Sequence, residues 1–480
     1  MQARVTDFLL YKWRYVLGYG LLFVVIGGLL FAASRYVPGG LRPAEIETAV
    51  KSGSLSLTSL DPTMVVNLPY YVLQRGVFML LGVSTFTIKL PSVMLAYLTV
   101  IGIALLITTW HRRNIAVIAT TIAATSVQFL FLAQDGTPLI MYSFLATWLL
   151  FASTYVTRQK IFGTLWKVLA GVLFAALLYT PFGIYLAIAV LTTILFHPHV
   201  RFIVKRFSTI RLVLAAVFGI ITLLPLIYAS FVNHSVVFTL LGIPQHFSQI
   251  PANFKQTTLD LVGFFAPANG SLARPLYTID VAILLLLGLV RLAAYRYTAR
   301  GYICIFWGIL LIPLVLINKD QATYLFPLAT LILAISISGI ITDWYKLFPR
   351  NPYARIVGLL PLGVLVLGVT ISGATRFLNT YHYSPSVVAT YSKDLSILQT
   401  QQLKNASSNN PTILIVAPSE QPFYSLVAKY DKRVAVATNS IGGGAIYTRA
   451  ARQALAPAGE MTDIVTSSHT TDADRFYVYK

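Results

Sequence analysis

About eleven long apolar segments, separated by short polar connections, are the feature that most constrains the fold of this chain. A helix needs roughly 20 apolar residues to cross a bilayer core of about 30 Å. Hydrophobic residues make up 56% of the sequence, charged residues only 11%, and the mean hydropathy is +0.73, which lies outside the range of soluble globular chains. We therefore predict an α-helical polytopic membrane protein with about eleven transmembrane helices. The apolar segments lie at residues 15–33, 89–110, 115–133, 138–156, 165–179, 182–196, 212–232, 277–294, 302–317, 324–341 and 356–374.

The distribution of positive charge predicts how the chain is oriented. The formal net charge of +20 comes from Lys and Arg residues that cluster between the apolar segments. Cytoplasmic connections of membrane proteins are enriched in these residues, so the pattern indicates topology and no binding to nucleic acid. With a cytoplasmic N-terminus, every cytoplasmic connection is basic, and the short outer connections 134–137, 180–181 and 318–322 carry only Lys319 as a basic residue. We expect a multi-pass protein of the plasma membrane, with segment 15–33 as an uncleaved anchor. The basic clusters are Arg4/Lys12/Arg14, Arg112/Arg113, Arg158/Lys160, Arg201/Lys205/Arg206/Arg211, Arg291/Arg296/Arg300 and Lys346/Arg350/Arg355.

The longer polar regions predict two outer loops and a separate C-terminal domain. Residues 1–374 form the predicted transmembrane domain, with a first outer loop at 34–88 and a second at 233–276. In the first loop, "LPYYVLQRGVFMLLG" is too short to span and predicts an amphipathic helix at the outer interface. Residues 375–480 contain the runs "TILIVA", "RVAVAT" and "FYVYK" beside a helical stretch, so we predict a small extracytoplasmic α/β domain there. The glycine-rich "SIGGGAIYT" lacks the Lys-Ser/Thr of a phosphate-binding loop and is interpreted as an ordinary loop.

Three carboxylates at the predicted outer face are candidates for chemistry. Glu45 and Glu47 lie in "PAEIE", just after the first apolar segment, and Asp135 lies in "AQDGTP". Such a carboxylate could accept a proton from a hydroxyl, as general bases do. Each also has a structural explanation, since acidic residues stabilise helix starts and Asp favours turns. No metal or other cofactor is expected, because His234 and His246 have no Cys or acidic partner at ligand spacing.

The order of several motifs suggests a known class of enzyme. "NLPYYVLQR" is followed by "IKLPSVMLAYL", then by "FLAQDGTPLIMY", and later by "KDQATYLFPLATLILA". In this order the chain resembles the GT-C class of polyprenyl-phosphate-sugar-dependent glycosyltransferases over roughly residues 15–341. Within that class it is most similar to the protein O-mannosyltransferases and the lipid A aminoarabinose transferases. The family opens its first outer loop with an Asp-Glu pair, whereas this chain has Ala44 and Glu45 there, so Glu45 or Glu47 must substitute for the catalytic acid.

The resemblance implies a reaction at the outer membrane surface. A polyprenyl-phosphate sugar would be the donor, and a hydroxyl of a protein, lipid or cell-envelope glycan would be the acceptor. Attack on the anomeric carbon would invert its configuration, with Glu45, Glu47 or Asp135 as the base. A cation would neutralise the polyprenyl phosphate that leaves.

Candidate substrate-binding residues follow from the same resemblance. They are Lys319, Tyr324, Arg75, Lys89 and Tyr70. Lys319 is preferred because the family carries a basic residue before its Tyr-Leu-Pro stretch, and the competing explanation is an ion pair with Asp320. For Arg75 and Lys89 the competing explanation is snorkelling, in which a long side chain extends its charge to the interface.

Two other functions remain open. A lipid-linked glycan polymerase or ligase would also act at the outer face, but the second outer loop, 233–276, contains only Lys255 and Arg274 as basic residues. A transporter or flippase of lipid-linked sugars would favour charges in the middle of spans, and the predicted spans are nearly free of them.

Overall fold

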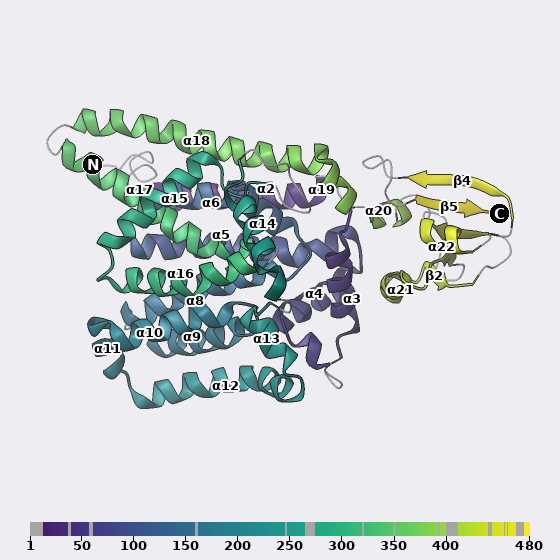
Figure 1. Cartoon of the computed structure of the whole chain (residues 1–480), viewed down its shortest axis with the longest axis horizontal. Helices are drawn as coiled ribbons and strands as arrows, with labels where there is room; N and C mark the ends of the chain where they lie inside the picture. The colour runs from purple at the N-terminus through teal and green to yellow at the C-terminus, as the bar shows by residue number, and fades with distance from the viewer. Residues whose placement is uncertain are drawn as a thin grey trace, which may run out of the picture.

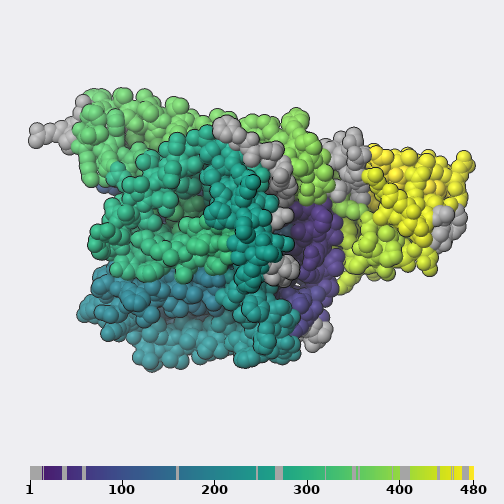
Figure 2. Space-filling view, viewed as in Figure 1, coloured from purple at the N-terminus to yellow at the C-terminus, as the bar shows by residue number. Residues whose placement is uncertain are grey.

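A helical body and a small C-terminal domain make up the computed structural model (Figure 1). The helical body contains the predicted spans and the two outer loops, and the C-terminal domain projects from one end of it (Figure 2). The structure describes residues 13–36, 40–56, 61–158, 162–244, 247–264, 274–318, 321–348, 352–391, 393–399, 411–439, 444–455, 457, 459–466 and 475–480.

Each predicted apolar segment coincides with a helix or with two consecutive helices. Among the described residues, seven helices are long and apolar enough to cross a membrane, or up to nine if each bent pair is one span. The other two predicted segments form shorter helices, of 15 residues in α9 and 16 in α15. The polytopic helical fold is thus confirmed. The helices are α2 (Arg14–Tyr36), α5 (Thr85–Trp110), α6 (Arg113–Thr125), α7 (Val127–Gln134), α8 (Leu139–Arg158), α9 (Gly163–Leu177), α10 (Gly183–Phe196), α11 (Pro198–Lys205), α12 (Thr209–Val232), α15 (Ile279–Ala294), α16 (Ala299–Ile317), α17 (Phe326–Leu347) and α18 (Pro352–Tyr383).

The two bent pairs have local causes in the sequence. Helices α6 and α7 meet at 62°, where the side chain of Ser126 accepts a hydrogen bond from the amide of Phe129 and starts α7. Helices α10 and α11 meet at 86°. Pro198 cannot donate the amide that would continue α10, and His197 caps α11 by accepting from the amide of Val200 at 3.4 Å.

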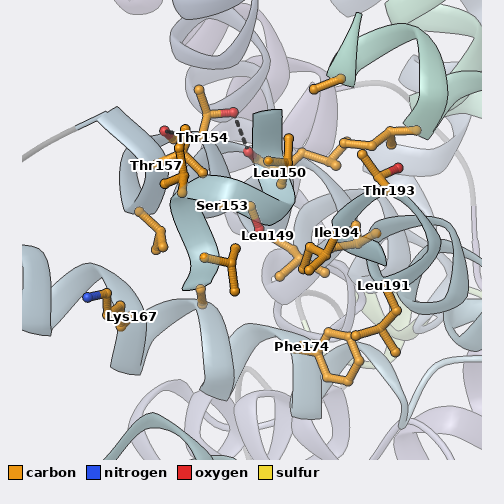
Figure 3. A pocket seen from close by; sticks show the side chains of 18 of the residues that line it. Leu149, Leu150, Ser153, Thr154, Thr157, Lys167, Phe174, Leu191, Thr193 and Ile194 are labelled. Atoms are coloured by element: carbon orange, nitrogen blue, oxygen red, sulfur yellow. Dashed lines mark hydrogen bonds between the residues drawn. The ribbon is translucent and has the colours of Figure 1, made fainter. Parts of the chain in front are cut away.

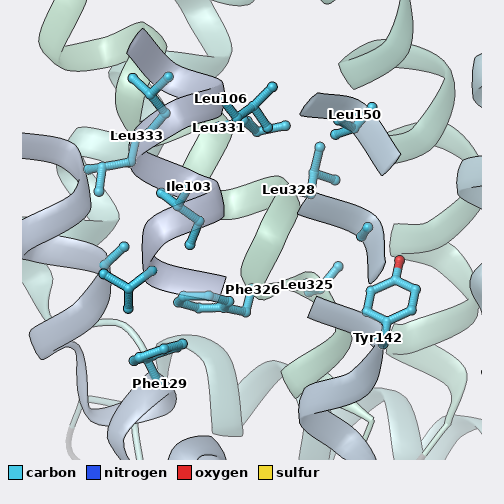
Figure 4. Packing of buried hydrophobic residues seen from close by; sticks show 14 of the residues in the cluster. Ile103, Leu106, Phe129, Tyr142, Leu150, Leu325, Phe326, Leu328, Leu331 and Leu333 are labelled. Atoms are coloured by element: carbon cyan, nitrogen blue, oxygen red, sulfur yellow. The ribbon is translucent and has the colours of Figure 1, made fainter. Parts of the chain in front are cut away.

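Aromatic and aliphatic side chains pack the centre of the helical body (Figure 4). The rings of Phe129 and Phe326 stack with their centroids 5.1 Å apart, and the indole of Trp307 donates to the hydroxyl of Tyr142 at 3.1 Å. In the most apolar stretch of each helix, 83% of the residues are buried in the span that contains α17, whereas 11% are buried in α12. A helix this apolar and this exposed requires an apolar surrounding, which a bilayer supplies.

The loop between α2 and α5 is folded against the rest of the protein. It contains α3 (Pro43–Ser54), the short 3-10 helix η2 (Pro62–Met64) and α4 (Leu68–Leu81). Helix α4 is the helix predicted for the membrane interface, and Met79, Leu80 and Leu81 at its end are exposed. The second outer loop contains α13 (Ser235–Leu241), η3 (Phe247–Gln249) and α14 (Ile250–Val262), and the 3-10 helix η4 (Ala322–Leu325) precedes α17.

The C-terminal domain is built on a five-stranded mixed sheet of order β2-β1-β3-β5-β4. Strand β1 pairs in parallel with β2 and β3, and β5 pairs antiparallel with β3 and β4. The small α/β fold predicted from the sequence is therefore present. The elements after α18 are α19 (Pro385–Thr390), α20 (Leu395–Ile397), β1 (Thr412–Ile415), α21 (Gln421–Tyr430), β2 (Val434–Ala437), β3 (Ala445–Thr448), α22 (Arg449–Ala454), β4 (Met461–Thr466) and β5 (Arg475–Tyr479).

Two details of this region differ from the sequence prediction. The interpretation of "SIGGGAIYT" as a loop is wrong in its second half, because Ala445–Thr448 is strand β3 and lies inside the sheet. Helix α18 also continues past residue 375, the predicted start of the domain, to Tyr383. It continues because Phe377 and Tyr381 pack on the ring of Phe131.

The C-terminal domain contacts the first outer loop through α21 and α3. The ammonium of Lys429 donates to the carbonyl of Gly53 at 3.1 Å. A Cβ atom at Gly53 would overlap the end of the Leu426 side chain, so glycine leaves room for that side chain where the two helices meet. Main-chain hydrogen bonds also join Leu41 to Lys393. The first outer loop and the C-terminal domain therefore lie at the same end of the helices.

Cysteine labelling tests the predicted orientation, since Cys304 is the only cysteine of the chain and is buried. Ser54→Cys and Ser419→Cys place exposed thiols in α3 and beside α21, and Ser208→Cys places one at the start of α12. We expect an impermeant maleimide to label the first two in intact cells and to label Ser208→Cys only after lysis. If only Ser208→Cys were labelled in intact cells, the orientation would be the opposite of the predicted one.

Candidate active site

The start of α3 positions Glu45. Pro43 occupies the first turn, where its fixed φ and missing amide are tolerated, and Arg42 is the residue before the helix. Glu45, three residues after Arg42, turns back so that its Oε2 accepts the amide of Arg42 at 2.8 Å. This is one half of a capping box. The sequence "RPAE" thereby fixes the carboxylate at the helix start, where it is 0% exposed.

The second oxygen of Glu45 reaches the connection between α7 and α8. Oε1 accepts the amide of Gly136 at 2.6 Å, across 91 residues of sequence. A Cβ atom at Gly136 would lie 2.9 Å from the side chain of Ile88 and 3.2 Å from Oε1 of Glu45. Gly136 therefore allows the approach of the carboxylate. The result is a direct bond between the first outer loop and the end of α7.

Asp135, beside Gly136, pairs with Arg42. Its Oδ1 accepts from Nε of Arg42 at 3.2 Å, and its Oδ2 accepts from Nη2 of the same guanidinium. The side chains are 15% exposed in Arg42 and 8% in Asp135. A bidentate pair of this kind holds both groups in one orientation. Both carboxylates are thus tied to the N-terminal end of α3.

Lys89, in the first turns of α5, completes the charged group. Its Nζ donates to the carbonyl of Gly40 at 3.0 Å and to the hydroxyl of Tyr381 at 3.1 Å. The ammonium also lies 5.3 Å from the ring centre of Tyr391. Lys89 is only 4% exposed, so the explanation that it snorkels to the interface is wrong.

These contacts define a carboxylate cluster, by which we mean Glu45, Asp135, Arg42 and Lys89 with the two tyrosines around them. The cluster combines two acids and two cations from α3, α5 and the α7–α8 connection. Burial raises the pKa of Glu45 above its usual range, and the charge of Lys89 opposes that shift. A buried carboxyl with a raised pKa is a stronger proton acceptor once it is ionised.

A layer of uncharged side chains from α4 supports the carboxylate cluster. Gln74 donates to the carbonyl of Ile88 at 2.8 Å and accepts from the hydroxyl of Ser52 at 2.6 Å. Tyr70, proposed for substrate binding, is fully buried, and its hydroxyl is 2.8 Å from that of Ser92. Its place in the structure is thus beside the cluster, where it fixes α4 against α5.

Two of the remaining sequence candidates, Glu47 and Tyr324, make their contacts outside the carboxylate cluster. Glu47 is 67% exposed and forms an ion pair with Lys51 at 2.7 Å. Tyr324 is buried between Tyr142 and Phe182, each at a ring distance of 4.9 Å. Arg75 has a buried Nε that forms no hydrogen bond within the described residues. Lys319 and Asp320 lie outside the described residues.

Arg42 and the two tyrosines were missed by sequence reasoning. Arg42 is three residues before Glu45, in the position that precedes a Pro-started helix, and this signal was available. Tyr381 and Tyr391 had no signal, because they follow Lys89 by about 300 residues and reach it only through the ends of α18 and α19.

Solved structures share this fold. ArnT from Cupriavidus metallidurans bound to undecaprenyl phosphate is 12% identical, with a TM-score of 0.55 over 96% of this chain and 98% of that chain. Its apo state is 14% identical, with a TM-score of 0.54 over the same shares. An Archaeoglobus fulgidus oligosaccharyltransferase tethered with an acceptor peptide is 13% identical, with a TM-score of 0.50 over 89% of this chain and 64% of that chain.

No family model and no curated protein matches the sequence. At these identities the structural likeness establishes the fold. The chain therefore has the same overall fold as ArnT over nearly its whole length, as the order of the motifs led us to expect.

Replacing Glu45 and Glu47 in turn tests whether the hydrogen bonds of Glu45 stabilise the fold. Glu45→Ala leaves the buried amide of Gly136 and the partly buried amide of Arg42 without acceptors, and each such group costs about 1–3 kcal/mol. We expect the free energy of unfolding to fall by about 2–6 kcal/mol, measured as a lower midpoint of thermal unfolding in detergent. Glu47→Ala removes only an exposed ion pair, worth about 0–1 kcal/mol, and is the matched control. Equal midpoints for the two variants would contradict the contacts of Glu45.

Proposed function

We propose that this protein is a membrane glycosyltransferase that moves a sugar from a polyprenyl-phosphate donor to a hydroxyl of a protein, lipid or cell-envelope glycan. The observation that carries the proposal is the carboxylate cluster at one end of a helical body whose fold is that of ArnT, a protein that was crystallised with undecaprenyl phosphate. The sequence motifs around the cluster resemble the same class independently.

The chemistry needs a base and a cation at the membrane surface. The polyprenyl chain stays in the bilayer, and its phosphate lies at the ends of the helices. The acceptor oxygen forms a bond to the anomeric carbon while the bond from that carbon to the phosphate oxygen breaks. The acceptor proton passes to a carboxylate, the bonding electrons leave with polyprenyl phosphate, and the configuration inverts. The cluster contains both required groups.

We assign the role of base to Glu45. Burial raises its pKa, and a base works best when its pKa lies near the working pH. Both oxygens of Asp135 accept hydrogen bonds from the guanidinium of Arg42. We therefore assign Asp135 the role of positioning that guanidinium and not the role of base. Glu47 is outside the cluster and is not needed.

Lys89 is the cation assigned to the donor phosphate. Its ammonium donates to two neutral oxygens, those of Gly40 and Tyr381. A phosphate could replace one of these acceptors at little cost, because hydrogen bonds to charged groups are the stronger ones. Lys319 remains a second proposed contact for the phosphate.

The acceptor must reach a carboxylate that is enclosed in this conformation. The segment from Gly40 to Arg42 covers Glu45 on one side and is held by main-chain hydrogen bonds to Tyr391 and Lys393. We infer that this segment separates from the C-terminal domain when substrates bind. Closure afterwards would exclude water from the donor.

The role of Glu45 is tested by replacing it with its neutral isostere. Glu45→Gln should lower turnover by about 10²–10⁴-fold, the usual contribution of a general base, while donor binding is largely kept. The wild-type rate should rise with pH through the raised pKa of Glu45, and this limb should vanish in the variant. Glu47→Gln is the matched control and should keep normal turnover. If Glu45→Gln kept normal turnover, Glu45 would not be the general base, and Asp135 would be the next candidate.

The role of Lys89 is tested by donor affinity. Lys89→Ala should weaken donor binding about tenfold to a hundredfold, because a hydrogen bond to a charged group is worth about 1.5–3 kcal/mol. Lys89→Arg should restore part of the loss, since the charge is kept and the geometry is changed. Measuring the donor affinity of Lys319→Ala in parallel distinguishes the contribution of Lys319 from that of Lys89. Unchanged affinity in Lys89→Ala would remove Lys89 from the donor site.

A further inference from the structure

A large cavity lies at the end of the helices opposite the carboxylate cluster. Its volume is about 710 Å³, and Trp110, the last residue of α5, lines it. Lys89 lies in the first turns of the same helix, about 32 Å away at 1.5 Å per residue. Figure 1 shows α11 at this end and α3 and α4 at the other. The cavity is therefore separate from the proposed active site.

Polar and apolar side chains both line the cavity, and Figure 3 shows its one labelled cation, Lys167, on the side away from Phe174 and Leu191. Lys167 on α9 lies at one side with Thr154 and Thr157 of α8. Phe174, seven residues after Lys167 on the same helix, lies at the other side with Leu191 of α10. Seven residues of helix correspond to about 10 Å. The cavity thus offers a polar region and an apolar region to a single elongated ligand.

Helix α11 forms one wall of the cavity. It crosses the end of α10 at 86°, and four residues on one of its sides line the cavity: His199, Val200, Ile203 and Val204. Arg201 and Lys205 are exposed. An amphipathic helix with this composition is typical of a membrane surface.

No acidic residue among the described lining residues balances the positive charge of Lys167. The sequence has no Asp or Glu between Asp135 and Asp260, and none of the described residues that line the cavity is acidic. Lys167 is 9% exposed, and its ammonium lies 4.1 Å from the ring centre of Phe207. Burying an ammonium without an anion is costly, and a cation–π contact offsets only about 0.5–2 kcal/mol. An anionic ligand would stabilise this arrangement.

We propose that this cavity binds one anionic glycerophospholipid of the adjacent leaflet. The phosphate lies at Lys167 beneath α11, and one acyl chain runs along Phe174 and Leu191. The cavity is within the range of about 300–1,000 Å³ typical of ligand pockets. Leu191 and Leu212 line it and are 48% and 39% exposed, so the rest of the lipid extends into the bilayer there. This site is independent of the glycosyltransferase proposal.

Native mass spectrometry of the full chain with added lipid tests the proposal. At equal concentration, phosphatidylglycerol should bind more tightly than phosphatidylcholine. Lys167→Gln should lower the affinity for phosphatidylglycerol by about tenfold to a hundredfold and should lower that for phosphatidylcholine less, because the choline offsets the charge of its phosphate. The matched control is Lys205→Gln, which removes an exposed lysine outside the cavity and should bind as the wild type does.

A second variant tests the apolar region without removing the charge. Leu191→Trp fills the cavity from a half-exposed position and should weaken binding of both lipids. Equal binding of the two lipids to the wild type would overturn the proposal, as would equal losses in Lys167→Gln and Lys205→Gln. Displacement of phosphatidylglycerol by undecaprenyl phosphate at lower concentration would overturn the assignment to a glycerophospholipid.

Discussion

The hydrogen bonds of the Glu45 carboxylate are the interaction on which the arrangement of α3 and the α7–α8 connection depends. One oxygen caps the start of α3, and the other accepts the amide of Gly136 between α7 and α8. Because the group is buried, both bonds lie in a region of low dielectric, where loss of an acceptor is costly. The ion pair of Arg42 with Asp135 follows from this placement, since Arg42 is the residue before α3 and Asp135 adjoins Gly136.

The same contact links the proposed chemistry to the position of the C-terminal domain. The segment before α3 pairs with the chain near Lys393, and α3 packs on α21. Lys89 is held between Gly40 and the end of α18, the helix that leads into that domain. Any displacement of the domain would therefore change the surroundings of both cations and of Glu45. The C-terminal domain therefore borders the carboxylate cluster.

Much of the fold could be predicted because a bilayer leaves few choices, and the apolar length of a segment gives the spans. The orientation stays a prediction from the positions of Lys and Arg. Glu45 and Asp135 could be selected because acids are rare in this chain and these two lie at predicted outer ends. The partners of Lys89 could not be predicted, since Tyr381 reaches it only through tertiary packing. Strand β3 was missed for a related reason: four residues after a glycine run become a strand only through pairing with β1 and β5.

Donor consumption by the purified protein tests the central claim most directly. The full chain, reconstituted in liposomes, is incubated with a panel of radiolabelled polyprenyl-phosphate sugars, and the release of polyprenyl phosphate and the transfer of label are measured. The account predicts that at least one donor is consumed, with the sugar transferred or hydrolysed at the anomeric carbon with inversion. Recovery of every donor intact, together with movement of labelled lipid between leaflets, would contradict it and favour a flippase.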